Sequence, residues 1–438
     1  MDDDEIDRIL EKTIPENILR RGRTTVDSLL GPVKDVLNRR QFPRKALTDL
    51  QIEMMFQLLS SLDTDKDPDA ARVGEREARV ASPYVGRLSA GFNHGIGRSG
   101  RLAAPQPKAP GASQMHQVAN SVALDAIRKL GLSNMKAGLV TPLSTGMTLS
   151  LVLGALRREY GVKRVLFPRI DHTSPHRAIA LSGLDEEIIP TLIEGDTVQV
   201  DLAALEKRIK SGGPSTVLAT TTFFPPRLSD PVKEISKACA EEDIPLVINN
   251  AYGVQSERVM SEIRAAADAG RVDAVVQSSD KNFFAPVGAS IVVTPKKDFN
   301  ESIADTYAGR ATAAPVVQTL AALLATGLDT YKDLQKEQVE NKSFLEERLN
   351  EIAGKLGQRV LSVWNPVACA ITMDGLDVKE IGARLYNARV TGPRAIEKGD
   401  VGSSVDNYPY SYIVMNAAIG ATKNDIETAT TKLYKQAS

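Results

Sequence analysis

Short apolar runs alternate with amphipathic segments from about residue 136 onward. The apolar runs are rich in β-branched residues, which is typical of buried strands, and the segments between them have the spacing of helices with one apolar face. This alternation predicts an α/β fold with a mostly parallel central sheet covered by helices. The predicted strands are residues 139–141, 164–167, 216–220, 246–248, 273–276 and 291–293, and the predicted helices between them include 202–209 and 232–239.

Both ends of the chain have other patterns. Residues 1–70 favour helix, because apolar residues recur at helical spacing over 51–62. The C-terminal part predicts a long helix over 314–354, strands over 368–373 and 412–415, and helices over 377–386 and 423–434. We therefore expect three domains: a helical N-terminal region (1–130), a large α/β domain (131–310) and a smaller α+β C-terminal domain (311–438).

Composition excludes several classes of protein. The chain has 438 residues, of which 42% are hydrophobic and 25% charged, with a net charge of -1. This predicts a globular protein of two or three domains, with any basic surface confined to a local stretch. No apolar run approaches membrane-spanning length, and the acidic start does not resemble a secretory signal. The only cysteines, Cys239 and Cys369, exclude a cysteine-rich zinc site and indicate a reducing, cytoplasmic setting.

Two charged stretches near the N-terminus need interpretation. Residues 20–45 are rich in Arg and Lys and contain few acids. Such a stretch is usually a solvated helix face, and the alternative is contact with the phosphate backbone of a nucleic acid. Residues 63–67, Asp-Thr-Asp-Lys-Asp, resemble the start of a calcium-binding loop. Pro68 stands where that loop needs Gly, and Gly74 stands where it needs a bidentate Glu, so we reject a calcium site.

Three segments of the sheet region carry candidate chemistry. Ser144-Thr145-Gly146 stands between a predicted strand and a helix, where exposed backbone N–H groups suit a phosphate. Asn249 ends the strand 246–248, at the position where pyridoxal-phosphate (PLP) enzymes of fold type I place an Asp against the pyridine nitrogen. Lys281 follows the strand 273–276, and desolvation between core strands can lower the pKa of a lysine so that it forms a Schiff base.

Each of these segments also has an ordinary interpretation. The first is a common α/β turn, Asn249 can close a turn, and Lys281 can be a surface lysine at a strand end. Their order decides between the readings, because Lys281 lies roughly thirty residues after Asn249 with one helix and one strand between them, as in a fold-type-I PLP enzyme.

A second cluster of candidate residues lies upstream. Residues 95–101 are glycine-rich around Arg98 and Ser99, and Gln106 follows shortly after. The segment lacks the features of a Walker loop or a dinucleotide fingerprint. A flexible backbone with Arg, Ser and Gln donors nevertheless suits an anion with several oxygens, to which Arg76 and Arg310 could add charge. Each arginine taken alone is more often part of a surface ion pair.

These motifs resemble the O-phosphoseryl-tRNA(Sec):selenocysteinyl-tRNA synthase family, in its shorter archaeal form. The resemblance extends over essentially the whole chain. The segments that carry it are 74–77, 94–100, 106–108, 144–147, 222–227, 250–252, 279–282, 309–311, 389–394 and 406–409.

The resemblance implies a fold-type-I PLP enzyme that converts O-phosphoseryl-tRNA(Sec) to selenocysteinyl-tRNA(Sec) with selenophosphate. It also implies a cytoplasmic homo-oligomer, expected to be a tetramer, that is not bound to a membrane. Lys281 matches the lysine that forms the Schiff base, and His172 stands where such enzymes often stack a ring on the cofactor. The remaining matches are Arg98, Ser99, Gln106 and Arg310 for the substrate phosphate, Arg76 for the cofactor phosphate across a subunit interface, Glu75 for a filter against free phosphoserine, and Arg394 for tRNA contact.

Rival interpretations stay open at this point. Within enzymes they are a synthase of cysteinyl-tRNA from phosphoseryl-tRNA, a selenocysteine lyase, or a cysteine desulfurase. A desulfurase needs a mobile Cys nucleophile, whereas Cys239 falls in a predicted helix and Cys369 in a predicted strand. A non-catalytic tRNA-binding scaffold is the alternative outside enzymes, and the presence of Lys281, Arg98 and Arg310 argues against it.

Overall fold

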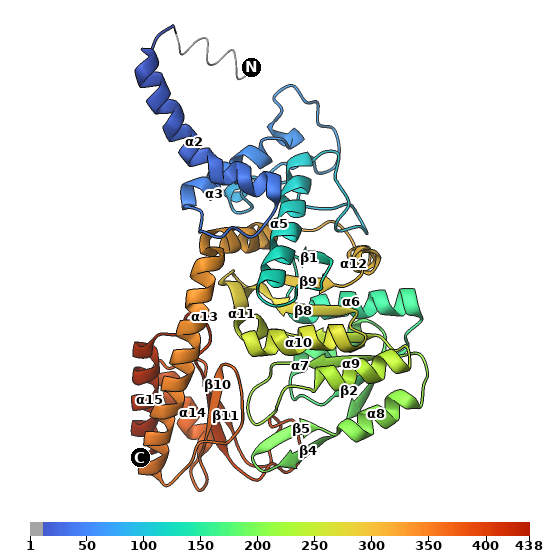
Figure 1. The fold of residues 1–438 in the computed structure, drawn as a ribbon, viewed down its shortest axis with the longest axis vertical. Helices are drawn as coiled ribbons and strands as arrows, with labels where there is room; N and C mark the ends of the chain where they lie inside the picture. The colour runs from blue at the N-terminus through green and yellow to red at the C-terminus, as the bar shows by residue number, and fades with distance from the viewer. Residues whose placement is uncertain (1–11) are drawn as a thin grey trace.

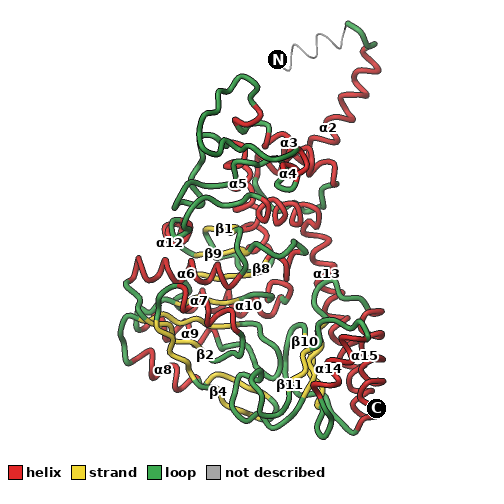
Figure 2. Tube along the Cα trace, turned by 180° about the vertical axis from the view of Figure 1, so that it is seen from behind, coloured by secondary structure: helices red, strands yellow, loops and turns green. Residues whose placement is uncertain are grey.

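The N-terminal part of the chain is built from helices and loops (red and green in Figure 2). The computed structural model describes residues 12–438, and its first helices are α2 (Glu16–Arg39), α3 (Asp49–Ser60), α4 (Pro83–Arg87) and α5 (Pro110–Lys129). α3 begins at a capping box in which Thr48 and Gln51 each accept the backbone N–H of the other. The helix predicted over 51–62 is confirmed. Of the predicted helical region 1–70, residues 1–11 lie outside the described part, and 61–70 form a short 3-10 turn and loop.

A seven-stranded sheet forms the centre of the molecule, with the order β1-β9-β8-β7-β6-β2-β3. All neighbours pair in parallel except β9, which is antiparallel to both β1 and β8. The predicted α/β class and mostly parallel sheet are therefore confirmed, and each of the six predicted strands is present. The strands are β1 (Ala137–Thr141), β2 (Arg164–Pro168), β3 (Asp185–Ile189), β6 (Ser215–Thr220), β7 (Leu246–Asn249), β8 (Ala274–Ser278) and β9 (Ser290–Thr294).

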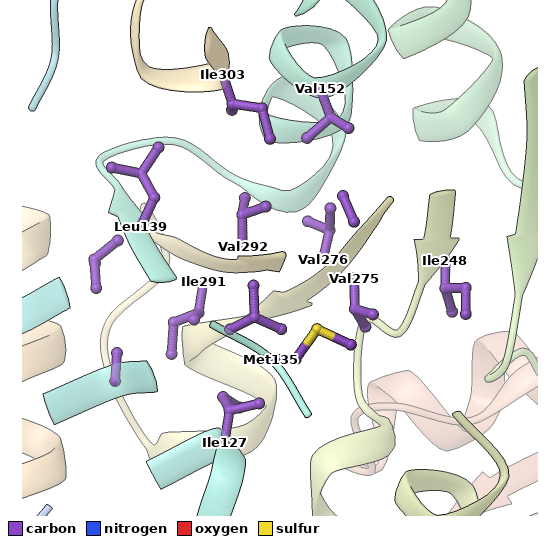
Figure 3. Packing of buried hydrophobic residues seen from close by; sticks show 14 of the residues in the cluster. Ile127, Met135, Leu139, Val152, Ile248, Val275, Val276, Ile291, Val292 and Ile303 are labelled. Carbon is purple, nitrogen blue, oxygen red and sulfur yellow. The ribbon is translucent and has the colours of Figure 1, made fainter. Parts of the chain in front are cut away.

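The inner strands of this sheet, such as β8 and β9, are buried on both faces, which explains why they are continuous apolar runs in the sequence. Successive side chains of β8 and β9 point to opposite faces (Figure 3). Val275 and Ile291 face Ile127 of α5, whereas Val276 and Val292 point the other way. The helices that connect and cover the strands are α6 (Thr145–Tyr160), α7 (Thr173–Leu181), α8 (Leu202–Lys210), α9 (Val232–Glu241), α10 (Glu257–Ala269), α11 (Ser279–Phe283) and α12 (Lys297–Ala304).

The apolar pattern did not predict three strands of this region. β3 lies at the edge of the central sheet and most of its residues are exposed or half-buried, so its sequence Asp-Glu-Glu-Ile-Ile has no apolar run. β4 (Thr191–Glu194) and β5 (Thr197–Val200) form a separate antiparallel hairpin. They were missed for a similar reason, because most of their residues are exposed or half-buried. Strands whose side chains are mostly exposed or half-buried give a weak apolar signal in the sequence.

α13 (Ala314–Leu356) runs from the N-terminal helices to the C-terminal sheet (Figure 1). The sequence predicted one continuous helix over 314–354, but the helix is interrupted at Gly327, which has a φ of 66° and a ψ of 166°. A Cβ at this glycine would lie 2.6 Å from the backbone nitrogen of Ala46. The N–H groups of Leu328 and Asp329 donate to the carbonyls of Pro43 and Arg44 instead of continuing the helix. The interruption is therefore caused by residues 43–47, which insert at the bend.

The C-terminal part has a small antiparallel sheet of its own, in the order β10-β12-β11. Its strands are β10 (Ala368–Thr372), β11 (Arg394–Ile396) and β12 (Tyr412–Asn416), and its helices are α14 (Val378–Asn387) and α15 (Lys423–Ala437). Every helix and strand predicted here is present, and β11, which has three residues, is the one that the apolar pattern missed. This region has an apolar cluster between α13, α14, α15 and the small sheet.

Candidate active site

A cavity of about 490 Å³ opens where strands of the central sheet end, and we call it the cofactor cavity. Six residues singled out from the sequence line it: Ser144, Thr145, Gly146, His172, Asn249 and Lys281. They come from four different segments, which follow β1, β2, β7 and β8, and these strands bring them to one edge of the sheet. Ligands of open α/β sheets bind at this edge, because the loops that follow parallel strands converge there.

Lys281 lies on α11, the single short helix that follows β8. The sequence interpretation of a desolvated lysine between core strands is wrong, because its side chain is exposed to the cavity. The neighbouring Asn282 is fully buried and holds the helix in place. Its Nδ2 donates to the carbonyls of Ala251 (2.9 Å) and Ser278 (2.8 Å), and its Oδ1 accepts the N–H of Val254 at 3.2 Å. Asn282 thereby ties α11 to the turn that follows Asn249.

Asn249 ends β7 with its side chain at the floor of the cavity. Its Oδ1 is buried and has no hydrogen-bond partner among the described residues. The adjacent Asn250 differs, because its Oδ1 accepts the hydroxyl of Thr221 at 2.7 Å. A buried amide without a partner is costly, so the open position suits a group that binds here.

The N-terminus of α6 forms another wall. Ser144 is the N-cap residue but makes no side-chain cap hydrogen bond, so the first N–H groups of the helix are left for another acceptor. A Cβ at Gly146 would lie 3.2 Å from that of Ser174, which shows how closely α7 approaches this turn. Together, a free helix N-terminus, an unpartnered amide and a lysine fit the phosphate, ring nitrogen and aldehyde of PLP.

His172 is the N-cap residue of α7. Its Nδ1 accepts the N–H of Ser174 at 3.3 Å, which leaves Nε2 to carry the proton of the neutral ring. Although the ring is exposed to the cavity, partial loss of water lowers its pKa, and the charges of Lys281 and Arg394 lower it further. A neutral ring can lie flat against a planar cofactor without adding charge.

Arg394, which the family resemblance assigns to tRNA contact, lies beside this cavity on β11. Its guanidinium is 4.3 Å from the ring centre of Phe224, which lines the cavity. Its Nη1 is buried without a partner, and burial lowers the pKa of the guanidinium. Phe223, Phe224 and Tyr252 also line the cavity, and the sequence reasoning gave them no role. Their signal was present in the motif segments 222–227 and 250–252.

A second cavity, of about 400 Å³, lies in the N-terminal part, and we call it the arginine cavity. It is lined by Arg76, Arg79, His94 and Arg310, among others. An Nη of Arg310 donates to the carbonyl of His94, and burial and the nearby Arg76 lower the pKa of Arg310. Glu75 and Arg76 are exposed, with 3.8 Å between Oε1 and Nε.

Arg98, Ser99 and Gln106 lie on segments next to the arginine cavity. The glycine-rich segment is laid against residues 309–311, because Ile96 exchanges backbone hydrogen bonds with Ala311 and the N–H of Gly100 donates to Gly309. A Cβ at Gly95 would lie 2.3 Å from the carbonyl oxygen of Ala311, so only glycine permits this approach. None of the described residues Arg76, Arg98, Ser99, Gln106 and Arg310 lines the cofactor cavity of the same chain.

Comparison with known proteins decides the family. The O-phosphoseryl-tRNA(Sec) selenium transferase family matches residues 62–437. The chain belongs to this family. Members of the family from Methanococcus maripaludis and Methanopyrus kandleri are each 43% identical to it, over 98% and 97% of this chain and 99% and 98% of theirs. The crystal structure of an archaeal O-phosphoseryl-tRNA(Sec) selenium transferase superposes with a TM-score of 0.94 at 43% identity, covering 97% of this chain and 98% of that one.

Membership of the selenium transferase family confirms the predicted fold-type-I PLP-dependent transferase. More distant structures share the fold alone, such as rice TDC with PLP and tryptamine, at 13% identity and a TM-score of 0.61. A cysteine desulfurase from Thermococcus onnurineus has the same fold, at 14% identity and a TM-score of 0.55. Cys239 and Cys369 are both buried, and burial raises the pKa of each thiol to about 12, so neither is a mobile nucleophile.

Proposed function

We propose that this chain converts O-phosphoseryl-tRNA(Sec) to selenocysteinyl-tRNA(Sec), with selenophosphate as the selenium donor. The observation that carries the proposal is 43% identity over almost the full length of the Methanococcus maripaludis O-phosphoseryl-tRNA(Sec) selenium transferase. The cofactor cavity supports it, because its residue types suit the chemistry of β-elimination and addition.

Bound PLP supplies an electron sink for the negative charge left at the substrate α-carbon. Lys281 would anchor the cofactor, and its Nζ, when free, would accept the α-proton of the substrate. Asn249 would hydrogen-bond the ring nitrogen of the cofactor, His172 would pack against its ring, and Ser144, Thr145 and Gly146 would bind its phosphate. Phosphate leaves the β-carbon, selenium of selenophosphate adds to the resulting double bond, and hydrolysis removes the phosphate carried by the selenium.

Asn249 has a specific consequence in this scheme. An amide hydrogen-bonds the ring nitrogen but cannot hold it protonated as a carboxylate does. Expulsion of phosphate from the β-carbon needs less stabilisation of the α-carbanion than transamination does. We propose that Asn249 is sufficient for elimination and limits transamination.

Arg98, Ser99, Gln106 and Arg310 bind the phosphate of the phosphoseryl group and then that of selenophosphate. Both are polyanions, so one arginine-rich site serves the leaving group and the incoming donor. These residues do not line the cofactor cavity of their own chain, which supports a site completed between subunits of a homo-oligomer, proposed to be a tetramer. Arg76 then reaches the cofactor phosphate of the neighbouring subunit, and Glu75 repels the carboxylate of free phosphoserine while tolerating the tRNA ester.

The tRNA is proposed to contact Arg394 and the basic residues 20–45. α2 carries most of that stretch, and its basic side chains are exposed. Three further proposals concern the whole chain: the division into 1–130, 131–310 and 311–438, the absence of a membrane association and a cytoplasmic location. Among residues 12–438, no helix is both long and apolar enough to cross a membrane.

The deciding experiment incubates the holoenzyme with O-phosphoseryl-tRNA(Sec) and selenophosphate and identifies the aminoacyl group on the tRNA. We expect selenocysteine on the tRNA, and no selenocysteine when selenophosphate is omitted. Cysteinyl-tRNA formed from sulfide, without selenocysteine from selenophosphate, would show the rival cysteinyl-tRNA activity. Binding of tRNA without any change of the aminoacyl group would show the scaffold.

A further inference from the structure

The turn Asp63-Thr64-Asp65 is the segment that resembled a calcium loop in the sequence. It follows the end of α3, and its side chains point into the protein: Asp63 is 1% exposed, and the side chain of Asp65 is 5% exposed. The side-chain oxygens of all three residues contact protein groups of the N-terminal part. The turn therefore has a use within the fold that its sequence pattern did not show.

Asp63 joins α3 to α5. Its Oδ1 accepts the N–H groups of Gly111 (2.9 Å) and Ala112 (3.1 Å), the first turn of α5. A Cβ at Gly111 would lie 1.8 Å from the carbonyl oxygen of Leu59. The end of α3 and the start of α5 are thus held in close contact. This contact fixes the point at which the segment that carries Gln106 and Lys108 joins α5.

Thr64 holds the segment that carries Gln106. Its backbone N–H and its hydroxyl both donate to the carbonyl of Lys108, at 3.1 and 3.0 Å. Its Oγ1 is also 3.3 Å from Nε2 of His94. Lys108 in turn forms an ion pair with Glu77, two residues after Glu75. One hydroxyl therefore contacts both of the segments 94–100 and 106–108.

Asp65 holds the other side of the arginine cavity. Its Oδ2 accepts Nδ2 of Asn93 at 3.0 Å, and its Oδ1 lies 3.9 Å from Nε2 of His94. The carbonyl of Asp65 accepts an Nη of Arg72 at 3.1 Å, and the carbonyl of His94 accepts Arg310. The contacts of the turn thus extend to segments around residues 72–79, 93–98 and 106–108, and through His94 to Arg310.

We infer that the Asp63-Thr64-Asp65 turn positions the residues that bind the phosphoryl group of the substrate. Neither Thr64 nor Asp65 lines the cofactor cavity, so their effect is on the placement of Gln106, His94 and Arg310 and not on the cofactor. The inference rests on the proposed function for the identity of the phosphorylated substrate. The contacts alone predict that the turn positions an anion-binding site, whichever phosphate compound binds there.

The test replaces Thr64 by Val, which keeps the shape and removes the hydroxyl, and by Ser, which restores the hydroxyl. Thr216→Val is the matched control, because the Thr216 hydroxyl also donates to a distant carbonyl, that of Pro245 at 2.9 Å, at the opposite end of β6 from the cofactor cavity. In Thr64→Val we expect KM for O-phosphoseryl-tRNA(Sec) and the Kd of inorganic phosphate for the holoenzyme to rise about fivefold to tenfold. We expect kcat within about twofold, an unchanged cofactor absorption band, and recovery in Thr64→Ser.

Equal KM and phosphate Kd values in Thr64→Val and Thr216→Val would overturn the inference. Asp65→Asn provides a second variant, since its amide oxygen can still accept Asn93, and we expect its phosphate Kd to rise less than that of Asp65→Ala. Failure of the proposed function would be seen separately, because the wild-type holoenzyme would then form no selenocysteinyl-tRNA. The phosphate Kd of the Thr64 variants would still test the role of the turn.

Discussion

The cofactor cavity and the arginine cavity are built in different ways. The first lies at the ends of paired strands, so the register of the sheet sets the positions of Asn249 and Lys281. The second is built from loops that depend on side-chain hydrogen bonds and on glycines such as Gly95. The residues proposed to hold the cofactor are therefore placed by the sheet, whereas the residues proposed to bind the substrate phosphate lie on loops that can change without altering the core.

Substitution of Lys281 should have the largest effect and should distinguish the function of the cofactor cavity from that of the arginine cavity. Lys281→Ala removes the residue proposed as cofactor anchor and base, and we expect kcat to fall by about a thousandfold or more. Borohydride treatment should label wild-type protein at Lys281 and leave the variant unlabelled, whereas phosphate binding should persist in both. A variant that stays labelled at another lysine would contradict the assignment.

Loss of Arg310 is the corresponding test of the arginine cavity. Arg310→Ala removes a guanidinium from the proposed phosphate site, and we expect kcat/KM to fall about tenfold to a hundredfold. The cofactor absorption band should be unchanged, and Arg310→Lys should recover part of the loss. A fall in cofactor content, measured by absorbance, would show that the two cavities are not independent.

Asn249→Asp should have a smaller effect, confined to the cofactor cavity. A carboxylate would keep the ring nitrogen protonated, so we expect elimination to continue within about tenfold of the wild-type rate and transamination side products to increase. Product analysis by mass spectrometry measures both. An inactive variant without cofactor would argue against the role given to Asn249.

The smallest expected effect concerns Glu75, at the exposed rim near the arginine cavity. Glu75→Gln removes repulsion of the substrate carboxylate in a solvated place, so we expect free phosphoserine to bind about twofold to fivefold more tightly. Binding of the tRNA ester should not change, which makes it the control. Unchanged affinity for phosphoserine would end the filter hypothesis.

The fold could be predicted from the sequence wherever a strand or helix buries a full face. The central strands β6 to β9 are of this kind, whereas the exposed edge strand β3 was missed. The break at Gly327 was also missed, because residues nearly three hundred positions away cause it. Interactions of that range leave no periodic signal in the sequence.

The candidate sites, like the fold, could be predicted from the sequence only in part. Motif order brought Asn249 and Lys281 together, but the exposure of Lys281 depends on the direction in which α11 leaves β8. Arg394 and Phe224 are far apart in the sequence, so their contact could not be predicted from residue spacing. The separation of the two cavities within this chain likewise depends on tertiary placement, which residue types and spacing do not encode.

The break in α13 has a consequence for how this chain can be divided. Residues 43–47 supply hydrogen-bond partners to Leu324, Leu328 and Asp329, so the N-terminal arm and the long helix complete each other. A chain shortened to begin after this segment would leave a gap beside Gly327 and backbone groups with no acceptor or donor. The segment 43–47 therefore cannot be removed without disturbing the long helix α13. It is part of the same folding unit as the helix that begins just after Arg310.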